Sequence, residues 1–474
     1  MEASALSLWA LPPRLCRHHH DSLARAQQDG LAPNRSTAGL AQPLPASMTL
    51  LASLSGALPH GDPLTAALVA VAVIMLVSQL LGALLQRWGQ PRVIGEILGG
   101  IALGPSLLGQ LAPGVEDALF GPAVRPQLNL LGQLGLALFM FLIGLELNPA
   151  LLQGRLPLAS RITAVGIALP LLLGVGLAEV LERWQPDLLP GNHSLAGALF
   201  MGTAMAITAF PVLARILQER GLVGQPLGAL AITVAAIDDL VSWILLAAVV
   251  AFARSGSLWG ALTPLLLTAV WAWLLLQGLA PLRRRLERHY SRHGELGPLL
   301  QVGLLAGALL SGALTEWMGV HLIFGAFLWG LAMPRHQGLQ ERLEQRIQPV
   351  VLQLMLPLFF AISGLNTRLL ALDHPALWAV TVLVLVVAVV GKFVGTWAMA
   401  RGSGVPPREA QALGWLVNTR GLTELVILNV GLGLGVISPT LFSIGVLMAV
   451  ATTVMTAPLL ERLGYGRQVQ GKPL

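Results

Sequence analysis

The sequence predicts an all-α polytopic membrane protein with about thirteen transmembrane helices. Of its 474 residues, 55% are hydrophobic and only 11% are charged, whereas soluble domains carry about 25% charged residues. Apolar runs of about 20 residues, the length that crosses a bilayer as a helix, recur from residue 64 to residue 463. Two of these runs hold polar residues beside a proline or a glycine, which predicts that their helices are discontinuous.

Residues 64–463 form the predicted transmembrane domain, and both ends of the chain differ from it. Residues 1–62 are rich in Pro, Ser, Gln, His and Arg and contain no spanning run, so we expect a disordered tail. A chain that began at Met48 would lose all four arginines of this tail. Residues 1–47 are therefore interpreted as a mis-assigned start or a loosely tolerated extension. Residues 464–474 are expected to form a short tail.

Thirteen spans are predicted, separated by short polar connections. They run over residues 64–86, 91–109, 127–147, 156–182, 194–219, 225–253, 257–280, 296–316, 319–335, 346–367, 375–401, 408–434 and 437–463. The second and the ninth are short and rich in glycine, so the number of spans depends on them.

The connections between spans alternate in charge, which predicts the orientation. One set holds nineteen basic residues, among them the five arginines of "RRRLERHYSR" at 283–292, whereas the alternate set holds only four. Basic residues concentrate in cytoplasmic connections. We therefore expect the C-terminus in the cytoplasm, the start of the first span outside, and the plasma membrane as the location.

The fifth span is predicted to break near Pro211, which lacks a backbone donor and disfavours helix at Phe210. Thr203 and Thr208 offer hydroxyls beside this break. Interrupted helices occur within membranes where their backbone lines a cavity.

The twelfth span is predicted to break near Gly421, which lies within a cluster of polar residues. The cluster comprises Asn418, Thr419, Arg420, Thr423 and Glu424. The two broken spans are seven apart, an odd offset that reverses direction across the membrane. An inverted repeat of six spans plus a linker predicts this offset.

The sixth span contains two adjacent acids, Asp238 and Asp239, in "LAITVAAIDDLVSWILLAAVV" (230–250). One ionisable group at the centre of a spanning helix costs roughly 2.5–3.5 kcal/mol on insertion scales. Neighbouring residues on a helix point ~100° apart, so the two acids face different surroundings. One can pair with a cation while the other lines a water-filled path; the alternative is that both are internal caps or hydrogen-bond hubs.

Lys392, in the eleventh span, is the expected partner for one of these acids. The chain has 27 Arg and only two Lys, and Lys, unlike Arg, can release its proton. This choice favours proton chemistry over simple neutralisation. Asp238 and Lys392 lie ~18 and ~14 Å from the cytoplasmic ends of their spans, in the same layer of the membrane.

Three further ionisable residues within spans are candidates for charge pairs. Arg420 and Glu424 are four residues apart and can pair on one helix face, a structural role to which direct participation in transport is the alternative. Glu96 is expected to pair with Arg420 or to cap a short helix.

Six motifs resemble those of the second monovalent cation:proton antiporter family, which includes NapA-type Na⁺/H⁺ antiporters, Kef-type potassium systems and plant cation/proton exchangers. They are "PRVIGEILGGIALGPSLLG" (91–109), "LGLALFMFLIGLELNP" (134–149), "TAMAITAFPVLARIL" (203–217), "AAIDDLVSWILLA" (235–247), "PLFFAISGLNT" (357–367) and "NTRGLTELVILNVG" (418–431). The resemblance covers about residues 64–463, with the motifs in the family's order.

The resemblance implies an inverted-repeat Na⁺/H⁺ antiporter fold with a dimerisation domain and a mobile core of spans 4–6 and 11–13. It implies that Asp239 is the carboxylate that binds the monovalent cation or the proton, and that Asp238 forms a salt bridge with Lys392. Thr208 matches the polar residue of the first unwound segment. Thr203, Asn418 and Thr419 are expected to complete the polar lining of the two breaks.

The expected function is secondary antiport of Na⁺ or K⁺ against protons. The double aspartate and the lysine resemble the electrogenic branch of the family, so electrogenic exchange is expected. We expect a homodimer in the bilayer, without enzymatic activity, cofactor or nucleic-acid partner. No G-x-G-x-x-G opens a βαβ unit, so no nucleotide-binding domain is expected. The alternatives are a cation channel and an intramembrane aspartyl protease, whose two carboxylates must share a proton from separate helices.

Overall fold

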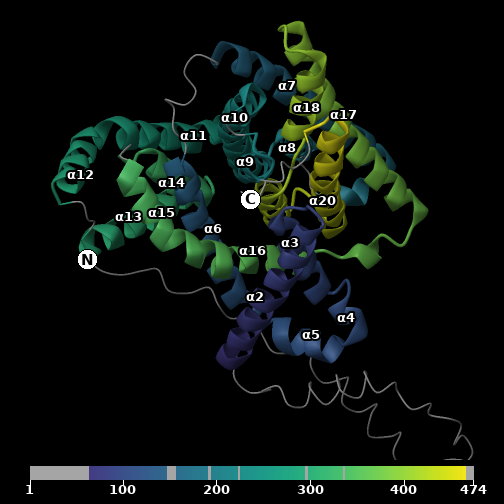
Figure 1. Ribbon diagram of the computed structural model, residues 1–474. Helices are drawn as coiled ribbons and strands as arrows, with labels where there is room; N and C mark the ends of the chain where they lie inside the picture. The colour runs from purple at the N-terminus through teal and green to yellow at the C-terminus, as the bar shows by residue number, and fades with distance from the viewer. Residues whose placement is uncertain are drawn as a thin grey trace, which may run out of the picture. The chain divides into compact units, whose positions relative to one another are not determined.

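The computed structural model describes residues 63–146, 156–190, 194–222, 225–293, 297–334 and 337–465. Within these ranges the regular structure is entirely helical (Figure 1). The expected tail at 1–62, with its alternative start at Met48, and residues 466–474 lie outside the described residues.

The helices follow the predicted spans closely. In chain order they are α2 (Pro63–Arg87), α3 (Arg92–Leu103), α4 (Leu108–Leu111), α5 (Pro113–Phe120), α6 (Arg125–Glu146), α7 (Leu156–Trp184), α8 (Ser194–Ala206), α9 (Phe210–Glu219), α10 (Pro226–Ser255), α11 (Leu258–Trp273), α12 (Ala280–His293), α13 (Pro298–Trp317), α14 (Leu322–Leu331), α15 (Gln337–Val350), α16 (Leu356–Leu365), α17 (Pro375–Gly402), α18 (Pro407–Val417), α19 (Leu422–Gly433) and α20 (Pro439–Arg462). Short helical turns, η2 (Pro186–Leu188), η3 (Leu274–Gly278), η4 (Val351–Met355) and η5 (Leu369–Ala371), join some of them.

Ten helical segments of the described chain are long and apolar enough to cross a membrane. Three shorter apolar helices, Leu195–Ala206, Leu322–Leu331 and Thr423–Gly433, lie in the fifth, ninth and twelfth predicted spans. Each of the thirteen predicted spans thus has a helix or a pair of helices, and the prediction of an all-α polytopic membrane protein is confirmed.

Both predicted breaks are present. The fifth span is divided into α8 and α9 by residues 207–209, and the twelfth into α18 and α19 by residues 418–421. Phe210 is already helical, although the following proline predicted otherwise. Pro211 occupies the first turn of α9, where its missing N–H has no intrahelical partner to lose. The inverted repeat stays a prediction.

The helices pack in two groups; Figure 1 shows α7, α8, α17 and α18 of one group in its upper part and α2, α3 and α16 of the other below them. The core group comprises α7, α8, α9, α10, α17, α18, α19 and α20. The second group comprises α2, α3, α6, α13, α14 and α16. The core group corresponds to spans 4–6 and 11–13, the set that the family resemblance implied. Contacts of α16 with α19 and of α3 with α20 join the two groups.

Glycines bring helices of the second group into close contact. A Cβ atom built at Gly364 in α16 would lie 2.0 Å from the backbone carbonyl carbon of Gly100 in α3. One built at Gly330 in α14 would lie 2.1 Å from the carbonyl oxygen of Phe141 in α6. Small residues of this kind let transmembrane backbones approach closely, since lipid provides no hydrophobic drive for helix association.

We expect Gly364→Ala and Gly330→Ala to destabilise the protein by about 1–3 kcal/mol, because the added methyl group overlaps a neighbouring backbone. Gly303→Ala in α13 and Gly176→Ala in α7 are matched controls, since a Cβ there would have no neighbour within 4 Å. Melting temperatures of the detergent-purified proteins test this difference. Equal melting temperatures for the two pairs would contradict the packing argument.

Candidate functional site

The two breaks lie against each other and satisfy each other's backbone. The Ala209 N–H donates to the Thr419 carbonyl over 3.0 Å, and the Thr208 hydroxyl donates to the Val417 carbonyl over 2.8 Å. The Thr423 hydroxyl in turn donates to the Thr208 carbonyl over 3.4 Å. Unwound backbone is tolerated at membrane depth only where protein or a cavity supplies such partners.

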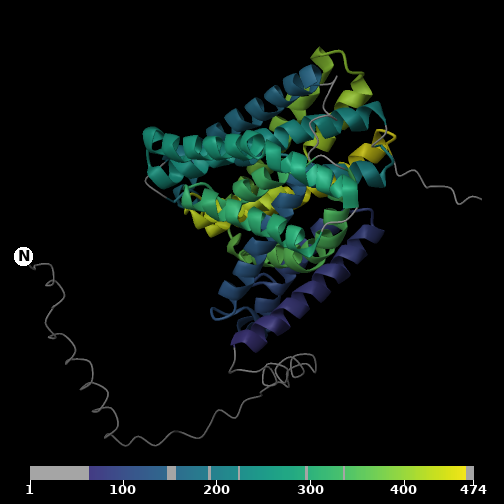
Figure 2. The same cartoon turned by 90° about the vertical axis from the view of Figure 1, so that its left-hand side faces the viewer.

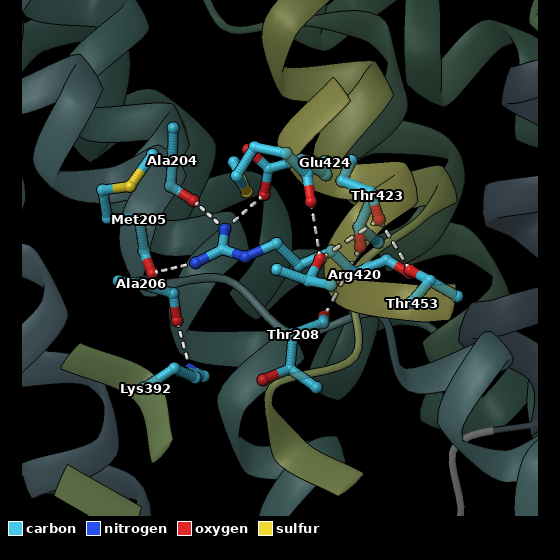
Figure 3. A network of polar contacts seen from close by, with 12 residues as sticks. Ala204, Met205, Ala206, Thr208, Lys392, Arg420, Thr423, Glu424 and Thr453 are labelled. Atoms are coloured by element: carbon cyan, nitrogen blue, oxygen red, sulfur yellow. Dashed lines mark hydrogen bonds and ion pairs between the residues drawn. The ribbon is translucent and has the colours of Figure 1, made fainter. Parts of the chain in front are cut away.

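Two buried cations cap the C-terminal end of α8 (Figure 3). Arg420 donates to the carbonyls of Ala204 and Met205, and Lys392 donates to the carbonyl of Ala206. The last carbonyls of a helix have no intrahelical partner, and this end carries partial negative charge. The end of α8 therefore binds two cationic side chains, Lys392 from α17 and Arg420 from the second break.

Each of these cations also has an acidic partner. Lys392 Nζ lies 2.8 Å from Asp238 Oδ1, joining α17 to α10, and both residues are fully buried. Arg420 Nη1 lies 2.7 Å from Glu424 Oε2, at the i,i+4 spacing noted in the sequence, and this pair is also fully buried. The structure thus brings together both pairs that the sequence suggested.

Asp239 has no such partner. Its side chain is 1% exposed, and neither carboxylate oxygen accepts a well-formed hydrogen bond from the described residues. The indole of Trp243, one turn further along α10, is the polar group that interacts with this carboxylate. The second oxygen of Asp238 also lacks a well-formed hydrogen bond, although Thr208 lies beside this acid. The adjacent acids do face different surroundings, but in this conformation Asp239 is enclosed by protein and does not line an open path.

The polar lining of the breaks differs in part from the expected one. Thr208, Asn418 and Thr419 are fully buried at the breaks. Both polar atoms of the Asn418 side chain lack a partner among the described residues. The prediction that Thr203 lines the unwound segment is wrong. It lies within α8, and its hydroxyl donates to the Leu199 carbonyl over 2.8 Å, one turn back in the same helix.

Glu96 does not meet Arg420. It lines a pocket with Gln86, Arg215 and Gln348, whereas the Arg420 guanidinium is held by Glu424 and two carbonyls. The cations that act on the Glu96 carboxylate are instead Arg215 of α9 and Arg92 of α3.

Sequence reasoning missed the support that α20 gives to the second break. The Thr453 hydroxyl donates to the carbonyl of Arg420, and the Thr456 hydroxyl lies 3.2 Å from that of Thr419. The signal was present in "ATTVMTAP" (451–458), where two threonines at i,i+3 share one face of an apolar helix. The role of the backbone carbonyls at the end of α8 could not be predicted, because no residue type in the sequence marks a carbonyl as a hydrogen-bond partner.

Around the breaks, the buried oxygens without a well-formed hydrogen bond include those of Asp239, one each of Asp238 and Glu424, and the amide oxygen of Asn418. Oxygen ligands of this kind suit hard cations. Within the described residues, no group of three or more His, Cys, Asp or Glu side chains could hold a metal ion. The arrangement therefore fits one weakly held ion or a proton better than a resident metal.

Comparison with known proteins gives consistent results. The chain is 43% identical over 395 residues to a protein of Synechocystis named Na⁺/H⁺ antiporter NhaS4, with 83% of this chain and 96% of the relative covered. It is 36% identical to Arabidopsis cation/H⁺ antiporter 17, covering 89% of this chain and 51% of the relative. It is 33% identical to yeast K⁺/H⁺ antiporter 1, covering 86% and 48%. The chain thus spans nearly all of the first relative and about half the length of the other two.

The fold resembles that of the sodium proton antiporter MjNhaP1 from Methanocaldococcus jannaschii, with a TM-score of 0.61, 15% identity, and 85% of this chain and 98% of that chain covered. Residues 48–462 match the family described as "Sodium/hydrogen exchanger, transmembrane". With most of its length matched, the chain belongs to the sodium/hydrogen exchanger transmembrane family.

Proposed function

We propose that the chain is a secondary antiporter that exchanges a monovalent cation for protons, with Asp239 as the group that binds both. The names of its relatives include sodium, potassium and unspecified cations exchanged for protons. The observation that carries the proposal is the burial of Asp239 without a cationic partner beside a complete ion pair, among the described residues.

The charges around the breaks support this role. Two cations, Lys392 and Arg420, face three carboxylates, those of Asp238, Glu424 and Asp239. If all were ionised, one negative charge would remain, and an uncompensated buried charge is strongly unfavourable. A proton or a monovalent cation at Asp239 would neutralise it, and each would exclude the other.

Lys392 supplies the second half of the mechanism. A cation bound beside Asp239 would also attract the second oxygen of Asp238, which lacks a well-formed hydrogen bond among the described residues. This attraction would weaken the bond from Asp238 to Lys392, and a buried amine without its counterion gives up its proton readily. Exchange of one cation for both protons would be electrogenic.

Two pockets support access from both sides of the membrane. One is lined by Ile232 near the start of α10, the other by Arg254 in its last turn. They lie seven residues before and fifteen residues after Asp239, or ~10 and ~22 Å along the helix. Both are lined by helices of both groups. We propose that movement of the core group against the second group exposes Asp239 to each pocket in turn.

We further propose a homodimer in the plasma membrane. The C-terminus is proposed to lie in the cytoplasm, the orientation that the charge of the connections favours. Neither alternative fits the site as well. An aspartyl protease needs two carboxylates that share a proton, but one oxygen of Asp238 is held by Lys392. A channel would conduct the cation without coupling it to protons.

Asp239→Asn should abolish cation-driven proton flux, because an amide neither releases a proton nor neutralises a cation. The assay is dequenching of a pH-sensitive dye in proteoliposomes on addition of Na⁺, K⁺ or Li⁺ in turn. Asp239→Glu, which keeps the charge, should retain partial flux. Full flux in the asparagine variant would refute the assignment.

Lys392→Gln should destabilise the protein by about 3–5 kcal/mol, because it leaves Asp238 buried without its partner. Adding Asp238→Asn should recover most of this loss, since the double variant removes both charges. Melting temperatures of the wild type, both single variants and the double variant measure the coupling. Additive losses would show that the pair has no energetic link.

Lys392→Arg should preserve folding but lose or alter voltage-driven transport, because arginine keeps its charge and effectively never releases a proton. Currents from proteoliposomes on a supported membrane, with and without an imposed potential, measure this. Unchanged electrogenic transport would remove Lys392 from the mechanism.

A further inference from the structure

Helix α12 has one buried face. Leu286 and Tyr290, one turn apart, are 8% and 7% exposed. The Tyr290 ring lies 5.9 Å from the guanidinium carbon of Arg342 in α15, so this face is directed towards α15. The face is thus fixed by packing against the rest of the protein.

The opposite face of α12 carries arginines. Arg284, Arg285 and Arg288 are exposed. Counted from Arg284 at ~100° per residue, they project at about 0°, 100° and 40°, whereas Leu286 and Tyr290 project at about 200° and 240°. All three arginines therefore point away from the protein on one side of the helix.

These arginines keep most of their donors free for a ligand. Arg284 Nε and Arg288 Nε donate to carbonyls one turn back, at 3.4 and 3.1 Å. Within the described part of the chain, none of the three forms an ion pair with a carboxylate. The neighbouring Arg283 differs, since it is half-buried and donates to the Leu276 carbonyl over 2.7 Å.

The arginines follow directly on a lipid-facing helix. α11 and α12, on the side that faces the viewer in Figure 2, belong to one helical segment, and only 6% of its most apolar stretch of 18 residues is buried. Arg284 comes two residues after Leu282, the last residue of the apolar run, or ~3 Å along a helix. Headgroup layers extend ~5–8 Å beyond the hydrocarbon on each side, which places the arginine face at the level of the headgroups.

We propose that Arg284, Arg285 and Arg288 form a binding surface for anionic phospholipid headgroups at this end of α11. Guanidinium groups bind phosphate oxygens in a bidentate fashion, and basic clusters beside a span attract anionic lipid. The general enrichment of basic residues on the cytoplasmic side would be satisfied by arginines anywhere in this connection. It does not explain why Arg284, Arg285 and Arg288 share one exposed face of α12, opposite Leu286 and Tyr290.

The position of α12 gives this surface a consequence for transport. The segment from α11 to α12 leads from α10 in the core group to α13 in the second group. Lipid bound at the arginines would anchor this connection at the membrane surface. The inference does not depend on which cation is carried or on the role of Asp239.

The test measures lipid binding to the detergent-purified full chain. The protein is titrated with phosphatidylglycerol or phosphatidylcholine, and native mass spectrometry detects the bound lipid. The wild type should prefer phosphatidylglycerol. The triple variant R284A/R285A/R288A should bind it about tenfold more weakly or worse, since each arginine near an anionic surface contributes about fivefold. The triple lysine variant, which keeps the charges, should retain most of the preference.

The matched control is R183A/R368A/R462A, which removes the same charge from exposed, dispersed positions and should bind phosphatidylglycerol like the wild type. Melting temperatures of both alanine variants in detergent check that they fold. No preference in the wild type, or equal losses in both alanine variants, would overturn the proposal. So would displacement of phosphatidylglycerol by inorganic phosphate at equal concentration, which would assign the surface to free anions.

Discussion

The site depends on one constraint, which is that backbone groups in the hydrocarbon must find partners inside the protein. Breaking α8 within the membrane leaves the carbonyls of residues 204–206 without helical partners. Arg420 and Lys392 fill that need. Buried cations in turn need acids, and Glu424 and Asp238 supply them. The charge network thus follows from the helix break, and Asp239 is the one member left over.

This reasoning also explains why a chain that uses Arg for nearly every positive charge has one buried Lys. Arg420 makes contacts that a planar, permanently charged group serves well, with two carbonyls and a carboxylate on one fork. Lys392 holds a single carbonyl and a single acid. The permanent cation lies where the fold needs a fixed charge, and the ionisable one lies beside the unpaired acid.

Much of this arrangement could be predicted from local patterns. Span length predicted the helices, and proline and glycine beside polar residues marked both breaks. Equal depth placed Lys392 in the layer of the two acids, and the family resemblance indicated Asp238 as its partner. What failed depended on long-range packing or on competition for hydrogen bonds. Glu96 was assigned to Arg420 because sequence does not reveal that Glu96 shares a pocket with Arg215 of α9. Thr203 was assigned to the break although threonine hydroxyls readily bond to the preceding turn of their own helix.

The mutual support of the breaks has a consequence for protein engineering. The Ala209 N–H donates to the Thr419 carbonyl, and the Thr208 hydroxyl donates to the Val417 carbonyl. Each break therefore depends on hydrogen-bond partners that the other break supplies. A chimaera that took only one of these segments from a relative of different ion preference would separate it from the segment that supplies its hydrogen-bond partners. The natural unit of transplantation is therefore the crossed pair, residues 204–209 together with residues 417–424.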